Sequence, residues 1–114
     1  LIRGLGYEGN VPFRSPYGER FGLHAWILLW LDRGNFLYDV PPIPPDYFRS
    51  DPQAMADSAV ARAQNGSILL FHDGEGLRVE SLEATAQSVR RLKAAGYEFV
   101  RLTELGHGGK AHPP

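Results

Sequence analysis

The chain has 114 residues, with 12 basic and 13 acidic side chains, a formal net charge of −1 and no cysteine. This length allows one small domain with a modest apolar core, and the lack of cysteine excludes disulfides and thiolate metal sites. The near-neutral charge without a basic stripe argues against nucleic acid as a partner, and no apolar run is long enough to span a membrane.

The first predicted elements alternate between strand and helix. Residues 11–14 predict a short strand, and residues 20–33 predict a helix that ends at Gly34. Residues 35–40, rich in aromatic and β-branched side chains, predict a second strand. The prolines in 41–45 are incompatible with helix or central strand, so a rigid extended loop is expected. The core face of the first helix would carry Leu23, Ile27 and Trp30 or Leu31.

The second half of the chain continues the alternation, which indicates parallel β/α units. Asp51 followed by Pro52 is typical of a helix start, with a carboxylate N-cap and proline at the first helical position. An apolar run predicts a buried strand over 67–72, and a long helix over 79–95 precedes a last strand at 97–102. The core faces of the two helices would carry Met55, Ala59 and Ala63, and then Leu82, Ala86, Val89 and Leu92 or Lys93.

The most informative segment is the end of the third predicted strand. The apolar run 68–71 is followed at once by His72, Asp73 and Gly74. Such a titratable pair at the C-terminal end of a parallel strand lies where ligands gather in α/β sheets and barrels. A histidine at this position is equally well explained as a local hydrogen-bonding cap. The segment 14–18, Arg-Ser-Pro-Tyr-Gly, has the same strand-then-turn character and favours the functional interpretation.

Together these motifs resemble the polysaccharide deacetylase family, the NodB-homology domain of carbohydrate esterases. The family carries Arg-x-Pro-Tyr-Gly after one strand and Leu-x-His-Asp after a later one, which stand here at residues 14–18 and 70–73. Residues 92–105 also look like the family's closing helix, turn and strand. The resemblance covers residues 5–105, and it is to the C-terminal half of the family's domain only.

The resemblance implies an α/β fold, the C-terminal half of a deformed (β/α) barrel with parallel strands that is incomplete in this chain. Residues 1–105 would form this part of the deacetylase domain, followed by a flexible tail at 106–114. The family's adjacent aspartates and its H-x-x-x-H helix, which supply the base and the metal ligands, have no counterpart here. We therefore expect a fragment of a longer parent protein, with no metal ligand of its own.

The implied function is metal-dependent deacetylation of N- or O-acetylated polysaccharide by the parent protein, with the isolated chain inactive. The partner would be an acetylated glycan, chitin-like or peptidoglycan-like, in the cell envelope or outside the cell. A divalent metal, zinc in the first place, would be bound by the parent and not by this chain. Two alternatives stay open: a non-catalytic NodB-like glycan-binding or structural module, and an unrelated small α/β binding domain.

Three residues would carry the chemistry by this resemblance. His72 would be the general acid that protonates the leaving amine, a task suited to a side chain that titrates near neutrality. Arg14 would pair with the catalytic base and hold it ionised, and Asp46 would orient His72. Further candidates to orient the ring are Asp39 and Asp73, in that order after Asp46. Without the resemblance, Arg14 would be assigned to a surface salt bridge.

Three further residues would contact the substrate. Tyr17 would donate a backbone N–H to the oxyanion and place its ring on the groove wall, although a turn role after Pro16 is the simpler interpretation. Leu70 would line the pocket for the acetyl methyl group. Tyr47 would replace the tryptophan that follows the orienting aspartate in the family, while the loop before it is about two residues longer than usual.

Overall fold

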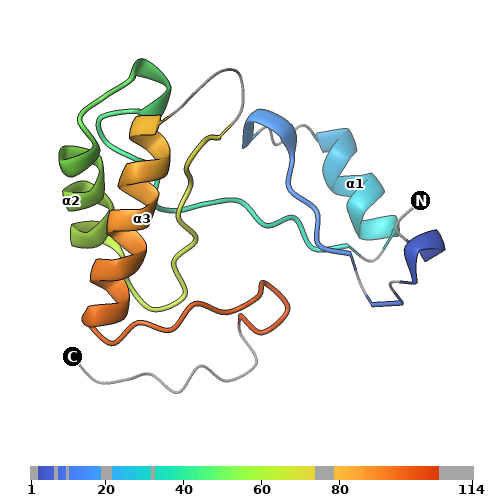
Figure 1. Cartoon of the computed structure of the whole chain (residues 1–114). Helices are drawn as coiled ribbons and strands as arrows, with labels where there is room; N and C mark the ends of the chain where they lie inside the picture. The colour runs from blue at the N-terminus through green and yellow to red at the C-terminus, as the bar shows by residue number, and fades with distance from the viewer. Residues whose placement is uncertain are drawn as a thin grey trace. The chain divides into compact units, whose positions relative to one another are not determined.

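The computed structural model describes residues 3–6, 8–9, 11–18, 22–31, 33–73 and 79–105. The chain divides into two compact units, Leu1–Leu37 and Tyr38–Pro114. The helices described in them are η1 (Arg3–Leu5), η2 (Pro16–Gly18), α1 (Gly22–Trp30), η3 (Asp46–Phe48), α2 (Pro52–Arg62) and α3 (Val79–Ala94), where η marks a short 3-10 turn. Figure 1 shows them in chain order.

Helix α1 of the first unit ends at Trp30, before the predicted end at residue 33, and its expected core face is exposed. Leu23, Ile27 and Trp30 are 72, 45 and 84% exposed, whereas Leu28 is buried. A unit of this size has too few residues to cover a helix that is apolar on nearly every side. The predicted buried face is therefore wrong.

A single parallel bridge between Phe13 and Asn35 stands where the first two strands were expected. Phe13 N–H donates to Gly34 O, and Phe36 N–H donates to Phe13 O. The next rung would join Ser15 N–H to Phe36 O, but Ser15 N–H donates to the Asn35 side chain instead. Because a side chain takes the place of the backbone acceptor, the pairing ends after one bridge.

Helix α2 begins as the sequence predicted. Asp51 is its N-cap, and the carboxylate accepts hydrogen bonds from the N–H groups of Gln53 and Ala54 at 3.3 and 3.1 Å. Pro52 occupies the first helical position, where its missing N–H costs nothing. Met55 and Ala59 are buried as expected.

Helices α2 and α3 lie side by side and form the core of the second unit (Figure 1). The α3 boundaries agree with the prediction to within one residue, and Leu92 is buried as predicted, but the start of the predicted face is wrong. Leu82 is 57% exposed, and the buried side chains are those of Ser81, Ala84, Ser88 and Leu92. The buried face of α3 therefore begins at Ser81 and not at the predicted Leu82. The small side chains on this face allow α3 to approach its neighbours closely.

The predicted strands at 35–40 and 67–72 also meet at one parallel bridge, which joins Val40 to Leu69. Val40 N–H donates to Ile68 O at 3.4 Å, and Leu70 N–H donates to Val40 O at 3.0 Å. The next rung would need an N–H from Pro42, which has none. The loop that follows Val40 therefore prevents the ladder from growing.

The expected half of a (β/α) barrel with parallel strands is wrong, because the described residues contain isolated bridges and no strand or sheet. The predicted strand at 97–102 has no regular structure over 97–101 and turns from Leu102 onward. Tyr97 instead anchors the segment, its hydroxyl donating to Ala63 O at 3.1 Å. The predicted tail, 106–114, lies outside the described residues. Within those residues, no helix combines the length and apolar character needed to cross a bilayer.

Candidate functional site

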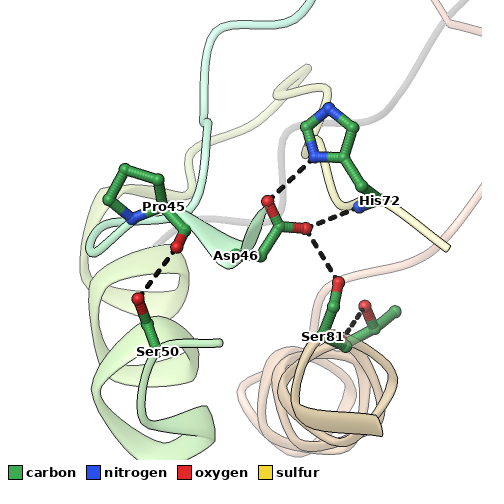
Figure 2. A network of polar contacts seen from close by, with 6 residues as sticks. Pro45, Asp46, Ser50, His72 and Ser81 are labelled. Atoms are coloured by element: carbon green, nitrogen blue, oxygen red, sulfur yellow. Dashed lines mark hydrogen bonds and ion pairs between the residues drawn. The ribbon is translucent and has the colours of Figure 1, made fainter. Parts of the chain in front are cut away.

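Asp46 is the centre of a polar network in the second unit (Figure 2). It opens η3, and only 2% of the residue is exposed. Its Oδ2 accepts hydrogen bonds from the His72 backbone N–H at 2.6 Å and from the Ser81 hydroxyl at 2.8 Å. Its Oδ1 lies 2.8 Å from Nδ1 of the His72 ring. Three donors thus replace the water that the buried carboxylate has lost.

The His72 side chain combines a fixed edge with an accessible one. Its side chain is 45% exposed, whereas that of Asp46 is fully buried. Because an ionised carboxylate can only accept hydrogen bonds, Nδ1 must be the donor, and the neutral ring therefore carries its proton on Nδ1. Nε2 lies on the side of the ring turned away from Asp46 (Figure 2). The arrangement can present this nitrogen to a ligand.

The environment of Asp46 keeps it ionised. Burial raises the pKa of Asp46, but the hydrogen bonds from Ser81 and from the ring and backbone of His72 outweigh burial. The pKa of Asp46 consequently lies below its ordinary range. At neutral pH the site therefore contains a permanent buried negative charge against one edge of His72.

The proline loop and the residues after η3 position Asp46. Pro45 is extended, with φ −60° and ψ 134°, and its carbonyl accepts the Ser50 hydroxyl at 2.8 Å. Arg49 ends η3 in the left-handed conformation, with φ 53° and ψ 46°. A non-glycine residue in that region is uncommon and is held there by the surrounding structure. The turn that carries Asp46 is thus fixed on both sides.

The other two carboxylates considered for orienting His72 differ from Asp46. Asp39 accepts the Ser67 hydroxyl at 2.9 Å and the Ile68 N–H at 2.7 Å, so it binds the start of the segment that ends at His72. Asp73 is exposed. The first of the three predicted candidates, Asp46, is the one that the structure places against the ring.

Aromatic side chains lie beside His72. Tyr47 is 54% exposed, and its ring centre lies 6.2 Å from that of His72 in an edge-on arrangement. Phe48 is 73% exposed and its ring centre lies 4.6 Å from that of Tyr47. Leu70 is partly buried, two positions before His72. Tyr47 therefore places exposed apolar surface beside the imidazole ring.

Arg14 and Tyr17 belong to the first unit, so their convergence with His72 stays a prediction. Arg14 is exposed, and its Nε donates to Phe36 O at 3.0 Å. Tyr17 is 97% exposed and has a φ of 57°, in the left-handed region that tyrosine rarely occupies. A local constraint holds this turn, because Gly18 N–H donates to Ser15 O at 3.2 Å.

Ser81 is the member of the network that the sequence did not reveal. A serine in the first turns of a helix is common, and no motif marks this one. The available signal was its spacing, because Ser81, Ala84, Ser88 and Leu92 repeat on one helical face. A polar residue on a buried face requires a partner, and here the partner is Asp46.

The described residues do not fit a divalent metal. Nowhere in the ranges that the structure covers do three or more histidine, cysteine, aspartate or glutamate side chains gather closely enough to hold a metal ion. His72 and Asp46 instead use their facing atoms on each other. Nδ1 of His72 and Oδ1 of Asp46 are therefore engaged within the pair.

Comparison with known proteins gives one partial similarity. Over 62 residues the chain is 34% identical to the peptidoglycan-N-acetylglucosamine deacetylase of Bacillus cereus. The matched stretch covers 54% of this chain and 29% of that enzyme, so the chain corresponds to less than a third of its length. No model of a known protein family matches the chain. Over this stretch the chain is similar to a carbohydrate-modifying hydrolase.

Proposed function

We propose that this chain supplies the proton-donating part of a carbohydrate deacetylase that acts on N-acetylated glycans. The observation that carries the proposal is the pair formed by Asp46 and His72, with one imidazole edge bound to a buried carboxylate and the other turned away from it. The partial similarity to a peptidoglycan deacetylase supports the same reaction class. The substrate class is therefore a polymer of N-acetylated sugars, peptidoglycan-like first.

The chemistry assigns a distinct task to each member of the pair. Water gives one proton to the catalytic base as it adds to the amide carbonyl, and the tetrahedral oxyanion that results collapses with cleavage of the carbon–nitrogen bond. The departing nitrogen needs a proton, and protonated His72 delivers one from Nε2 to form the free amine and acetate. Asp46 holds the Nδ1–H edge throughout, so the proton that leaves is the one on the accessible side.

The remaining parts of the reaction lie outside this pair. A divalent metal does not fit the described residues, and no step of the proposal passes through one. Arg14 would hold the catalytic base ionised, and the backbone N–H of Tyr17 would stabilise the oxyanion. Leu70 would line the pocket for the acetyl methyl group.

The neighbouring aromatic side chains favour glycan as the ligand. Tyr47 lies beside His72 and Phe48 lies beside Tyr47, and both residues are more than half exposed. Pyranose rings present apolar faces of C–H groups that stack on aromatic rings, while their hydroxyl groups need polar partners at the edge. The imidazole of His72 supplies a polar group next to the ring of Tyr47.

A second candidate function is that of a non-catalytic glycan-binding module. The exposure of Tyr47 and Phe48 favours this alternative, because exposed aromatic rings suffice for glycan binding. It predicts that His72 contributes to glycan affinity and that no acetate is released.

Acetate release from N-acetylglucosamine oligomers separates these functions. The measurement uses the full-length protein that carries this sequence, as wild type, His72→Ala and the exposed control Gln64→Ala. We expect His72→Ala to lower kcat on the order of a hundredfold or more with little change in KM, since a general acid acts in the chemical step. Unchanged kcat in His72→Ala would refute the proton-donor role. Glycan binding by an inactive wild type would favour the binding module.

A further inference from the structure

We propose that Ser81 is the positioning residue that fixes Asp46 so that His72 keeps its proton on Nδ1 and presents Nε2 to the glycan. This inference deepens the proposed function and rests on it for the role of Nε2. The hydrogen bond itself is a property of the folded chain and can be tested without turnover.

The contact between Ser81 and Asp46 is buried and directional. Ser81 lies in the first turn of α3, 1% exposed, with its Oγ 2.8 Å from Oδ2 of Asp46. Because an ionised carboxylate has no proton to give, the Ser81 hydroxyl must donate. In an environment without water, such a bond to a charged acceptor is stronger than the same bond in solvent.

The network divides its donors between the two carboxylate oxygens. Oδ2 accepts both the His72 backbone N–H and the Ser81 hydroxyl, and Oδ1 accepts the His72 ring. This division fixes the plane of the carboxylate and reserves Oδ1 for Nδ1. Figure 2 shows Ser81 and His72 reaching Asp46 from different directions.

Ser81 is also the donor that comes from outside the His72 segment. The other two hydrogen bonds both come from His72, so Ser81 is the donor of this network that links Asp46 to α3. Helix α3 is packed along α2, and its first turn therefore provides a rigid reference for Asp46. Removing the hydroxyl should leave the Asp46 carboxylate free to turn, so that its contact with Nδ1 of His72 is made for a smaller part of the time.

Ser88 offers a matched control on the same helix. It is also 1% exposed, but its hydroxyl donates to the Ala84 carbonyl of the same helix at 2.8 Å. Replacement of either serine by alanine removes one buried hydroxyl from the same face of α3. A merely structural effect should therefore be similar at both positions, whereas an effect on His72 should be confined to Ser81.

The decisive measurement is the tautomer ratio of His72 in the ¹⁵N-labelled 114-residue chain. Two-bond nitrogen–proton spectra at about pH 8.5, where histidine side chains are generally neutral, distinguish Nδ1–H from Nε2–H. We expect Nδ1–H to predominate in the wild type and in Ser88→Ala. We expect Ser81→Ala to lower the ratio of Nδ1–H to Nε2–H at least about twofold, since partners in one network are coupled by about 0.5 kcal/mol or more.

Two further variants keep the test decisive. Ser81→Thr retains the hydroxyl and should keep the wild-type tautomer ratio. Ser81→Cys retains the shape with a weaker donor and should lower the ratio of Nδ1–H to Nε2–H. If Ser81→Ala does not fold, Ser81→Cys decides. A wild-type ratio in a folded Ser81→Ala or Ser81→Cys chain would overturn the inference.

An activity measurement separates failure of the inference from failure of the proposed function. In the full-length protein, Ser81→Ala should lower kcat more than Ser88→Ala does, with KM nearly constant. If the tautomer ratio falls but the wild type releases no acetate, Ser81 still positions His72 and the deacetylase proposal fails. If the ratio and kcat are both unchanged in an active enzyme, the inference fails and the deacetylase proposal stands.

Discussion

Asp46→Asn should reverse the tautomer of His72. Asparagine keeps the shape of aspartate but has one oxygen and one NH₂ group. Its oxygen is expected to take the Oδ2 position, where two donors, the His72 backbone N–H and the Ser81 hydroxyl, need an acceptor. The NH₂ group then faces Nδ1, which must become an acceptor, and the ring proton moves to Nε2.

The cost in stability follows from the three hydrogen bonds of the network. A hydrogen bond to a charged group contributes about 1.5–3 kcal/mol and a neutral one about 0.5–1.5 kcal/mol, so each bond weakens by about 1 kcal/mol. Two bonds are weakened and the third is reversed. Because Asp46 is 2% exposed, water cannot replace what is lost. We therefore expect the free energy of unfolding to fall by about 2–3 kcal/mol at neutral pH.

The difference between the two proteins should depend on pH. The pKa of Asp46 is lowered in the folded state, so its contribution is present above the unfolded pKa of about 3.9 and is lost as the pH falls through the lower folded pKa. Asparagine does not titrate. The advantage of the wild type over Asp46→Asn should consequently shrink below about pH 4.

Urea unfolding at about pH 7 and about pH 3, with nitrogen NMR of His72, tests this reasoning. Asp57→Asn is the control, because the Asp57 side chain is 55% exposed and its ion pair with Arg91 at 2.6 Å lies at the surface. That substitution should change the free energy of unfolding much less than Asp46→Asn does, because solvent screens an exposed ion pair. Unchanged stability and an unchanged tautomer in Asp46→Asn would show that the network does not control the ring.

Two further predictions concern the helices of the second unit. Met55→Ala should lower the free energy of unfolding by about 2–5 kcal/mol, because Met55 is fully buried. Leu82→Ala, at a 57% exposed position, should lower it by less than about 1 kcal/mol. Equal losses of stability in urea unfolding would contradict the observed buried faces of the helices. Asp51→Ala should cost about 1 kcal/mol and accelerate amide exchange at Gln53 and Ala54, the two N–H groups that it caps. Unaltered exchange at both amides would refute the cap.

The strands were mispredicted for a reason that lies in two particular segments. Residues 35–40 and 67–72 have the composition of strands, and each does form a bridge with a parallel partner. The bridge at Val40 cannot extend because Pro42 has no N–H to offer. Composition measures the preference of each segment by itself, whereas a ladder requires two segments to offer donors and acceptors in register.

The sequence by itself determined the local features of this protein. Asp51 and Pro52 start α2, and Gly96, with a φ of 89°, follows the end of α3, because caps and breakers act on neighbouring backbone groups. It also singled out Asp46 and His72 through the family resemblance. Their roles in catalysis stay predictions.

Only the tertiary structure decided which distant groups meet. Ser81 is 35 positions from Asp46, and no local rule joins a helix serine to a carboxylate after a proline loop. The same packing selected the buried face of α3, where Ser81 is enclosed and Leu82 is exposed. A buried carboxylate must find donors wherever the fold supplies them, and this requirement is settled by packing rather than by the order of residues.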